Sequence, residues 1–226
     1  ASVKQHGVLV PGIVRVRPAG GYEIIAGHTR KRVCELAGIE SMPMVIRNLN
    51  DDEACIVMVD SNIQREDILP SEKAKAYKMK HDAMKNQGLP GNSLKLIGEE
   101  NGENYKAVQR FIWLSRLNDD LLEMVDCKKL GFSQGVSISA LQPEEQELLY
   151  RILVELGIKL SLVQASTIKQ LSVDGKLTEE MLVRYLNEIK DVAVPRKVTI
   201  KNDTLDTFFT KEYSEAEIMD IIFGLL

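Results

Sequence analysis

The sequence predicts an α+β protein with three parts: a small mixed α/β unit, a larger all-helical region and a short strand–helix unit. Short β-branched runs alternate with glycine-rich turns up to residue 68, which is typical of strands. Beyond Pro70, apolar residues recur at helical spacing. After Val194 and Pro195, one β-branched run precedes an amphipathic segment. These changes place the predicted domains at 1–68, 69–192 and 193–226.

The first unit is predicted to contain two strands joined by a hairpin turn, a helix, a third strand and a second helix. The first four lie at 13–17, 22–26, 29–37 and 42–47, and the second helix begins at Asn50. Thr29 can cap the first helix, and Gly38 ends it. Residues 1–7 resemble the tail of a helix that ends at Gly7, so we expect that a natural N-terminus has been removed.

The helical region is predicted to contain helices at 71–87, 94–102, 104–114, 119–128, after Gly135, 144–156, 160–171 and 178–190. The C-terminal unit is predicted to contain a strand at 197–200 and a helix at 216–226, which Ser214 and Glu217 open as a capping box. A unit this small buries little apolar surface by itself. We therefore expect it to dock on the body or to pair with a second copy.

Composition excludes several classes of protein. The three cysteines (Cys34, Cys55 and Cys127) are far apart and the three histidines lack ligand spacing, which argues against a disulfide framework or a zinc site. No apolar run reaches membrane-spanning length, and we expect a cytoplasmic protein. The net charge is −4, yet residues 1–50 hold seven basic against three acidic side chains, which allows a local basic patch.

The stretch from Tyr22 to Arg32 reads as a strand, a glycine and the start of a basic helix. Cationic side chains at a helix start conflict with the helix dipole, and a bound anion removes that conflict. Gly27, His28, Thr29 and Arg30 are therefore candidates for a phosphate-binding turn. The alternative is a solvated turn with surface arginines.

A second donor-rich stretch follows the second helix. Asn62, Gln64 and Arg65 place amide and guanidinium donors within four residues. Together the two stretches could hold a nucleoside triphosphate with magnesium, for which Asn62 is the candidate ligand. The alternative is an ordinary polar helix end.

The helices at 94–102 and 104–114 form a helix-turn-helix pattern. Ile97, Val108 and Ile112 are expected inside. The candidate DNA-contacting residues at the front of the second helix are Asn104, Tyr105, Lys106, Gln109 and Arg110. Gln and Arg can reach base edges, and Lys suits phosphates. The alternative is an ordinary pair of packed helices.

The two donor-rich stretches, in this order and followed by a helix-turn-helix, resemble the ParB partition-protein family over roughly residues 3–140. The family's boxes are usually Gly-Glu-Arg-Arg and Glu-Asn-hydrophobic-Gln-Arg. Here they correspond to the stretches that begin at Gly27 and Ser61, and the segment from Gly7 to Arg15 is similar to the family's first nucleotide-contacting segment. The C-terminal tail looks most like ParB-like proteins of plasmids and integrative elements.

The resemblance implies a CTP- and magnesium-binding N-terminal domain, with Gly7, Val10 and Pro11 near the cytidine. It implies that residues 27–30 hold the phosphates and that Asn62, Gln64 and Arg65 close the far side. It also implies a homodimer that recognises palindromic double-stranded DNA, closes as a sliding clamp, and works with a ParA-type ATPase. The protein would then associate with the nucleoid or a plasmid.

Two departures from the family pattern bear on activity. His28 and Ser61 stand where the family usually has glutamates that it associates with magnesium and hydrolysis. We therefore expect nucleotide binding to survive better than hydrolysis, with at most a weak CTP hydrolase.

One alternative to a partition protein is a DNA-binding regulator or replication accessory of a mobile element. Another is a nucleotide-using enzyme on the same fold, such as sulfiredoxin, but that enzyme needs a cysteine in the phosphate turn, and Cys34 lies beyond it.

Overall fold

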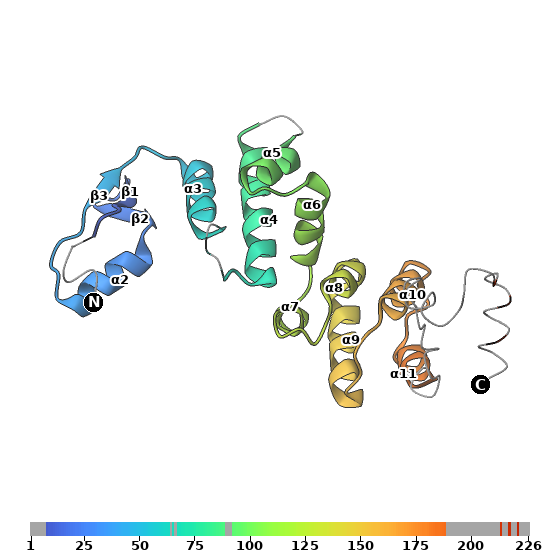
Figure 1. Cartoon of the computed structure of the whole chain (residues 1–226). Coiled ribbons are helices and arrows are strands. Elements are labelled where there is room, and N and C mark those ends of the chain that lie inside the picture. The colour runs from blue at the N-terminus through green and yellow to red at the C-terminus, as the bar shows by residue number, and fades with distance from the viewer. Residues whose placement is uncertain are drawn as a thin grey trace. The chain divides into compact units, whose positions relative to one another are not determined.

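The structure is a computed structural model and describes residues 8–63, 65, 67–88, 92–188, 213, 217 and 221. The first part of the described chain contains β1 (Gly12–Val16), β2 (Tyr22–Ala26), α2 (His28–Ala37), β3 (Met44–Ile46) and α3 (Asp51–Ile63). The second part is helical (Figure 1), with α4 (Pro70–Asn86), α5 (Ser93–Glu100), α6 (Tyr105–Leu114), α7 (Asp119–Asp126), α8 (Phe132–Ile138), α9 (Pro143–Leu156), α10 (Leu162–Val173) and α11 (Glu179–Glu188). The predicted α+β class is confirmed.

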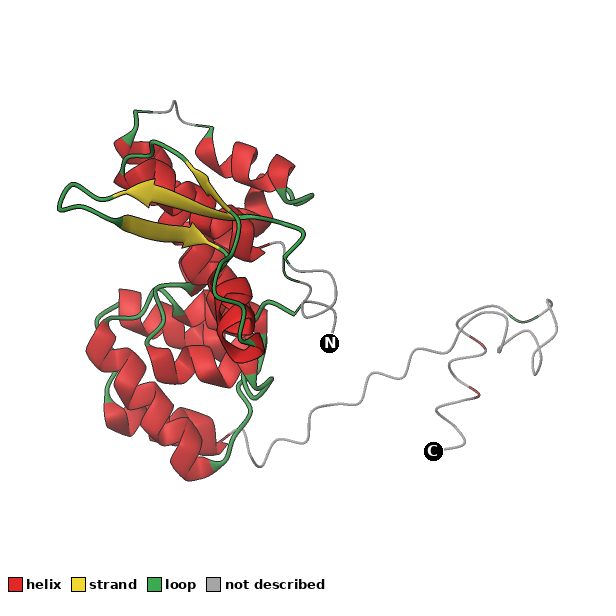
Figure 2. Ribbon diagram, turned by 90° about the vertical axis from the view of Figure 1, so that its left-hand side faces the viewer, coloured by secondary structure: helices red, strands yellow, loops and turns green. Residues whose placement is uncertain are grey.

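The three strands form one sheet in the order β2-β1-β3 (Figure 2). Strands β1 and β2 are antiparallel, and β3 runs parallel to β1. The predicted hairpin turn is confirmed: the Gly20 N–H donates to the Arg17 carbonyl at 3.0 Å. Gly20 and Gly21 have φ values of 90° and 81°, a conformation that glycine adopts without steric cost. Both strands of the hairpin were therefore predictable from their turn.

The starts of the first two helices differ in how they are capped. Helix α2 begins at His28, after Gly27 as the N-cap residue, so the prediction that Thr29 caps it is wrong. Thr29 already lies in the first helical turn, because Gly27 takes the left-handed backbone conformation that ends the strand. Helix α3 is capped as predicted: the Glu53 N–H donates to Asn50 Oδ1 at 2.9 Å, and the Asn50 N–H donates to Glu53 Oε2 at 2.8 Å.

One predicted helix boundary in the helical region is wrong. Helix α8 begins at Phe132 instead of after Gly135, and Leu141 lies beyond its end. Gly135 lies inside the helix, at a point where a Cβ atom would lie 2.8 Å from Leu114 Cδ1, so glycine allows close packing against α6. The other helices agree with their predicted ranges to within a few residues.

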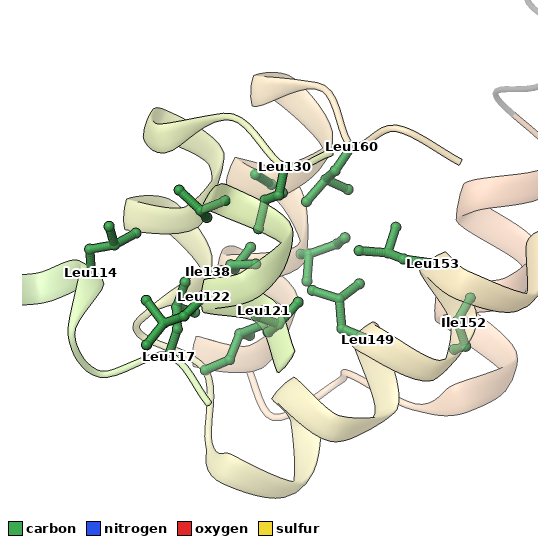
Figure 3. Close-up of a cluster of buried hydrophobic side chains, with 14 of the residues drawn as sticks. Leu114, Leu117, Leu121, Leu122, Leu130, Ile138, Leu149, Ile152, Leu153 and Leu160 are labelled. Atoms are coloured by element: carbon green, nitrogen blue, oxygen red, sulfur yellow. The ribbon is translucent and has the colours of Figure 1, made fainter. Parts of the chain in front are cut away.

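Two apolar clusters form the core of the described residues. The larger gathers side chains from α4 and α6 to α11, including Leu121, Ile138 and Leu149 (Figure 3). The smaller joins Val59 and Ile63 of α3 to buried residues of α4, α5 and α6. Helix α3 therefore packs on the helical region, and it also contacts β2.

The internal contacts of the chain divide it into Ala1–Leu186 and Asn187–Leu226. The predicted strand at 197–200 lies outside the described residues, as does the predicted helix at 216–226 apart from positions 217 and 221. The domain boundaries at 68 and 193 remain predictions. None of the described helices is long and apolar enough to cross a membrane.

A buried lysine joins three helices. The Lys80 side chain on α4 is only 1% exposed, and its ammonium group forms ion pairs with Asp60 on α3 and Glu100 on α5. Both carboxylates are partly exposed, so the cation is the deeply buried partner. A buried charge is tolerated when opposite charges and hydrogen bonds replace its hydration. The two carboxylates therefore replace the lost hydration of the Lys80 ammonium group.

We predict that the double variant Asp60→Asn/Glu100→Gln lowers the free energy of unfolding by on the order of 3–5 kcal/mol, because it leaves a buried ammonium without a carboxylate. Each single variant retains one carboxylate and should cost much less than half of that loss. Urea titration followed by circular dichroism measures both. Asp119→Asn is the matched control, since it removes the exposed partner of Lys75 on the same helix and should cost well under about 1 kcal/mol. Additive single effects would contradict the shared role of the two carboxylates.

His81 on α4 contacts the start of α5. Its Nδ1 lies 2.8 Å from Ser93 Oγ, and Ser93 is buried. Burial lowers the pKa of His81 below its ordinary value of 6.5, and the nearby Lys85 and Lys78 lower it further, against an opposing effect of Asp82. The folded protein therefore favours the neutral imidazole.

Because the pKa of His81 is lower in the folded state, the unfolded chain binds the proton first as pH falls. We predict that the protonation of His81 leaves the free energy of unfolding unchanged well above pH of about 6.5. Below that pH, protonation should lower the free energy of unfolding progressively. Comparing the free energy of unfolding at pH 8 and pH 5.5 checks this. The pH-dependent loss should be smaller in His81→Gln, while His28→Gln is the control that removes an exposed histidine. An unchanged loss in His81→Gln would refute the assignment.

Candidate anion site and DNA-binding face

The predicted phosphate turn forms at the junction of β2 and α2. Gly27 has a φ of 109°, and a Cβ atom there would lie 3.0 Å from Gly12 Cα, so only glycine fits. No side chain caps α2, and its first intrahelical bond runs from the Lys31 N–H to the Gly27 carbonyl. The preceding N–H groups lack helical acceptors, as at any helix start. This turn can therefore accept an anion.

Arg30 links the phosphate turn to the segment before β1. Its Nη1 donates to the Val10 carbonyl at 2.7 Å and to the Pro11 carbonyl at 2.6 Å. The structure therefore brings Val10, Pro11, Gly27 and Arg30 together although nearly twenty residues separate the two segments. His28 and Thr29 are exposed on the same turn. Gly7 lies outside the described residues.

Two residues of the second donor-rich stretch line a groove that includes no residue of the phosphate turn. Asn62 and Arg65 are exposed and line a groove between α3 and α4. The other lining residues are Met58, Val59, Ile68, Glu72, Lys75, Ala76 and Met79, and none comes from the phosphate turn. Gln64 lies outside the described residues. The described residues thus do not bring the two stretches into one pocket.

The chemistry of these side chains suits phosphate better than it suits a protein-held metal ion. Gly27 and Arg30 offer N–H groups and a cation, and Arg65 offers a second cation. The described residues contain no group of three or more His, Cys, Asp or Glu side chains that could hold a metal ion. The Asn62 amide oxygen is the ligand that the second stretch can offer to magnesium arriving with a nucleotide.

The helix-turn-helix pattern is present as α5 and α6. A Cβ atom at Gly98 would lie 2.5 Å from the Glu103 carbonyl oxygen, so glycine allows the turn to fold back onto α5. Asn104 caps α6, since its Oδ1 accepts from the Ala107 N–H at 2.9 Å. Ile97 and Val108 are fully buried and Ile112 nearly so, as predicted. The cap uses the Asn104 side chain, which leaves its neighbours to form the exposed face.

The outward face of α6 carries the exposed residues Tyr105, Lys106 and Trp113, together with Gln109, whose exposure is intermediate. Tyr105 and Trp113 are 50% and 38% exposed, and each lies one turn from Gln109. Trp113 is absent from the predicted set, although its spacing of four residues from Gln109 places it on the same face. This face combines an ammonium group that can contact phosphates, an amide that can reach base edges, and two aromatic rings.

Arg110 lies at the border between α6 and α8. Its Nη2 donates to Ser133 Oγ at 2.7 Å, and its guanidinium lies 5.0 Å from the centre of the Phe132 ring. The side chain therefore contacts α8 instead of extending freely from the front of α6. The exposure of the residue as a whole is intermediate.

The turn between α5 and α6 is fixed to α4 by a charged group. Glu103 forms an ion pair with Lys73 and accepts a hydrogen bond from the Tyr77 hydroxyl at 3.1 Å. Burial raises the pKa of Tyr77, and the charge of Glu103 raises it further, so the phenol stays a donor. These contacts hold the start of α6 at a defined position on α4.

The chain is similar in sequence to known proteins over most of its length. Residues 1–63 match the ParB N-terminal domain family. The chain is 28% identical over 191 residues to a probable chromosome-partitioning protein ParB of Vibrio cholerae, which covers 84% of this chain and 58% of the relative. It is 28% identical over 223 residues to a nucleoid occlusion protein of Listeria innocua, which covers 97% of this chain and 72% of the relative. The chain thus spans about half to three quarters of the length of these relatives.

Two solved structures of the C-terminally truncated chromosome-partitioning protein ParB from Caulobacter crescentus are also similar. The one complexed to the centromeric parS site has a TM-score of 0.48 and 24% identity, over 75% of this chain and 85% of the other. The one complexed with CTP-γ-S has a TM-score of 0.28 and 26% identity, over 68% of this chain and 82% of the other. Residues 1–63 thus match the ParB N-terminal domain family, and the longer chain is similar in sequence to ParB and nucleoid occlusion proteins.

Proposed function

We propose that this chain is a sequence-specific DNA-binding protein of the ParB partition type whose N-terminal unit binds CTP. The observation that supports it most is the presence, in one unit, of an anion-binding turn at Gly27 and a recognition helix with an exposed polar face. Helix α3 connects them, since it contacts β2 at one side and packs on α4 to α6 at the other. A plain helix-turn-helix protein has no need of the first feature.

Nucleotide binding is proposed at the turn from Gly27 to Arg30, where the Arg30 side chain contacts the segment before β1. The backbone N–H groups at the start of α2 and the Arg30 guanidinium suit a triphosphate, and Val10 and Pro11 lie beside them for the nucleoside. Asn62 and Arg65 lie in the groove on α4, with Gln64 next to them in sequence. The proposal therefore includes a rearrangement of α3 that brings this second stretch to the phosphates.

The proposal favours nucleotide binding over hydrolysis. His28 and Ser61 provide no carboxylate where the family pattern usually has glutamate. Without those acids, a magnesium ion bound with CTP would keep the phosphate oxygens and waters as its main ligands. Nucleotide would then act as a switch, with release by dissociation more than by cleavage.

The DNA partner is proposed to be a palindromic duplex bound by a homodimer, with a ParA-type ATPase as the protein partner in plasmid or chromosome segregation. The absence of both acids also favours a second function, that of a DNA-binding regulator or replication accessory without a nucleotide switch. Calorimetric titration of the protein with CTP, ATP and GTP in the presence of magnesium separates the two. Selective CTP binding supports the partition function, and DNA binding without nucleotide binding supports the regulator.

We predict that Arg30→Ala weakens CTP binding by about 1.5–3 kcal/mol, because it removes a charge-assisted hydrogen bond to phosphate. Isothermal titration measures the change. Arg32→Ala is the matched control, since Arg32 lies on the same helix, is 70% exposed and pairs with Glu35. Equal affinities for the two variants would show that the turn does not hold the phosphates.

We predict that Gln109→Ala weakens binding to the preferred duplex by about 1–3 kcal/mol and relaxes the choice of base at one position. Lys106→Ala should instead weaken binding to all duplexes and reduce the salt dependence, because it removes a phosphate contact. Fluorescence anisotropy with a duplex enriched from a random pool measures both. Gln170→Ala on α10 is the control for loss of an exposed glutamine. The same loss on every duplex for Gln109→Ala would assign that residue to the phosphates.

A further inference from the structure

Arg110 is held by two side chains of another helix. Ser133 Oγ accepts a hydrogen bond from Arg110 Nη2 at 2.7 Å, and the Phe132 ring lies under the guanidinium at 5.0 Å. Planar guanidinium groups stack on aromatic rings and keep their in-plane donors available. One donor is used by Ser133, and these two residues are the partners that the described residues give to the guanidinium.

Phe132, whose ring lies near the Arg110 guanidinium, packs against the apolar core. Phe132 packs on Phe111 with ring centres 4.8 Å apart, and Phe111 meets Tyr77 edge-on at 5.7 Å. Lys73 lies 5.0 Å from the centre of the Phe111 ring, which adds a cation–π contact. This row of rings connects α8 to α4 through α6, so Phe132 has packing partners besides Arg110.

Helix geometry places Arg110 beside the exposed face of α6. It follows Lys106 by four residues and Gln109 by one, so it lies at the edge of that face toward α8. An arginine side chain loses rotamer freedom when it binds, and prior ordering reduces that loss. The hydrogen bond and the cation–π contact therefore order the Arg110 side chain before any ligand binds.

We propose that Ser133 and Phe132 are positioning residues that orient Arg110 for reading a base, so that the sequence preference of α6 depends on α8. The inference rests on the proposed DNA-binding function and adds to it a determinant 23 residues away from the reader. A purely structural contact between α6 and α8 would affect stability and overall affinity, but it would not affect one base position selectively.

The test begins by enriching a preferred duplex from a random-sequence pool with the full chain. Dissociation constants are then measured by anisotropy for that duplex, for each single base-pair variant and for an unrelated duplex. Ser133→Ala should reduce discrimination at one base pair by about 5-fold or more, with unchanged binding to the unrelated duplex. Arg110→Ala should lose discrimination at the same base pair, and the double variant should lose no more. Ser133→Thr keeps the hydroxyl acceptor and should restore the preference.

Ser137→Ala is the matched control, because it removes a hydroxyl one turn further along α8. Thermal melting of every variant reports whether the fold is retained. The inference would be overturned if Ser133→Ala weakened binding to every duplex by the same factor. It would also be overturned if this variant discriminated between base pairs as well as the original protein does. Failure of the original protein to enrich any sequence would overturn the proposed function itself, and with it the inference.

Discussion

The buried ammonium of Lys80 is the constraint on which much of this structure depends. A cation that is 1% exposed requires its carboxylates to stay in place, and these come from α3 and α5. Lys73 and Tyr77 lie on the same side of α4 and hold Glu103 in the turn before α6. Helix α4 thus fixes both ends of the turn region through charged contacts, while the apolar cluster around Ile97 and Val108 supplies the burial. Apolar packing alone would allow the helices to shift against one another, whereas these ion pairs define one position of α5 and of the turn before α6 on α4.

Ion pairs also hold helix α3 in place, both at the sheet and at the helical region. At its start, Asp51 pairs with Arg15 of β1 at 2.7 Å, and Arg15 also pairs with Glu23 of β2. Near its end, Asp60 pairs with Lys80. The helix is therefore tied to the sheet at one end and to the helical region at the other. Because Asn62 follows Asp60 by two residues, a ligand that drew Asn62 toward the phosphate turn would pull on the Lys80 contact. The proposed nucleotide site and the proposed DNA-binding face would therefore be linked through this helix, which contacts β2 and packs with α4 to α6.

Local signals in the sequence predicted the elements well. The Asn50–Glu53 capping box, the stop at Gly38 and the hairpin turn all depend on neighbouring residues. Contacts between distant residues were not predictable. A lysine at a helical position is normally exposed, and nothing near Lys80 in sequence indicates partners twenty residues away on both sides. The Arg30 contacts with Val10 and Pro11, and the Ser133 contact with Arg110, depend in the same way on the tertiary fold.

The charge of the chain explains why ordered contacts matter for the proposed function. A net charge of −4 gives little general attraction to DNA, whose phosphates dominate non-specific binding. Several cations near the helix-turn-helix are already paired, as Lys73 is with Glu103 and Lys95 with Glu99. With a weak general attraction, the ratio of specific to non-specific affinity rests on the few side chains that reach base edges. Fixing Arg110 by stacking and a hydrogen bond increases the contribution of one such side chain without adding charge.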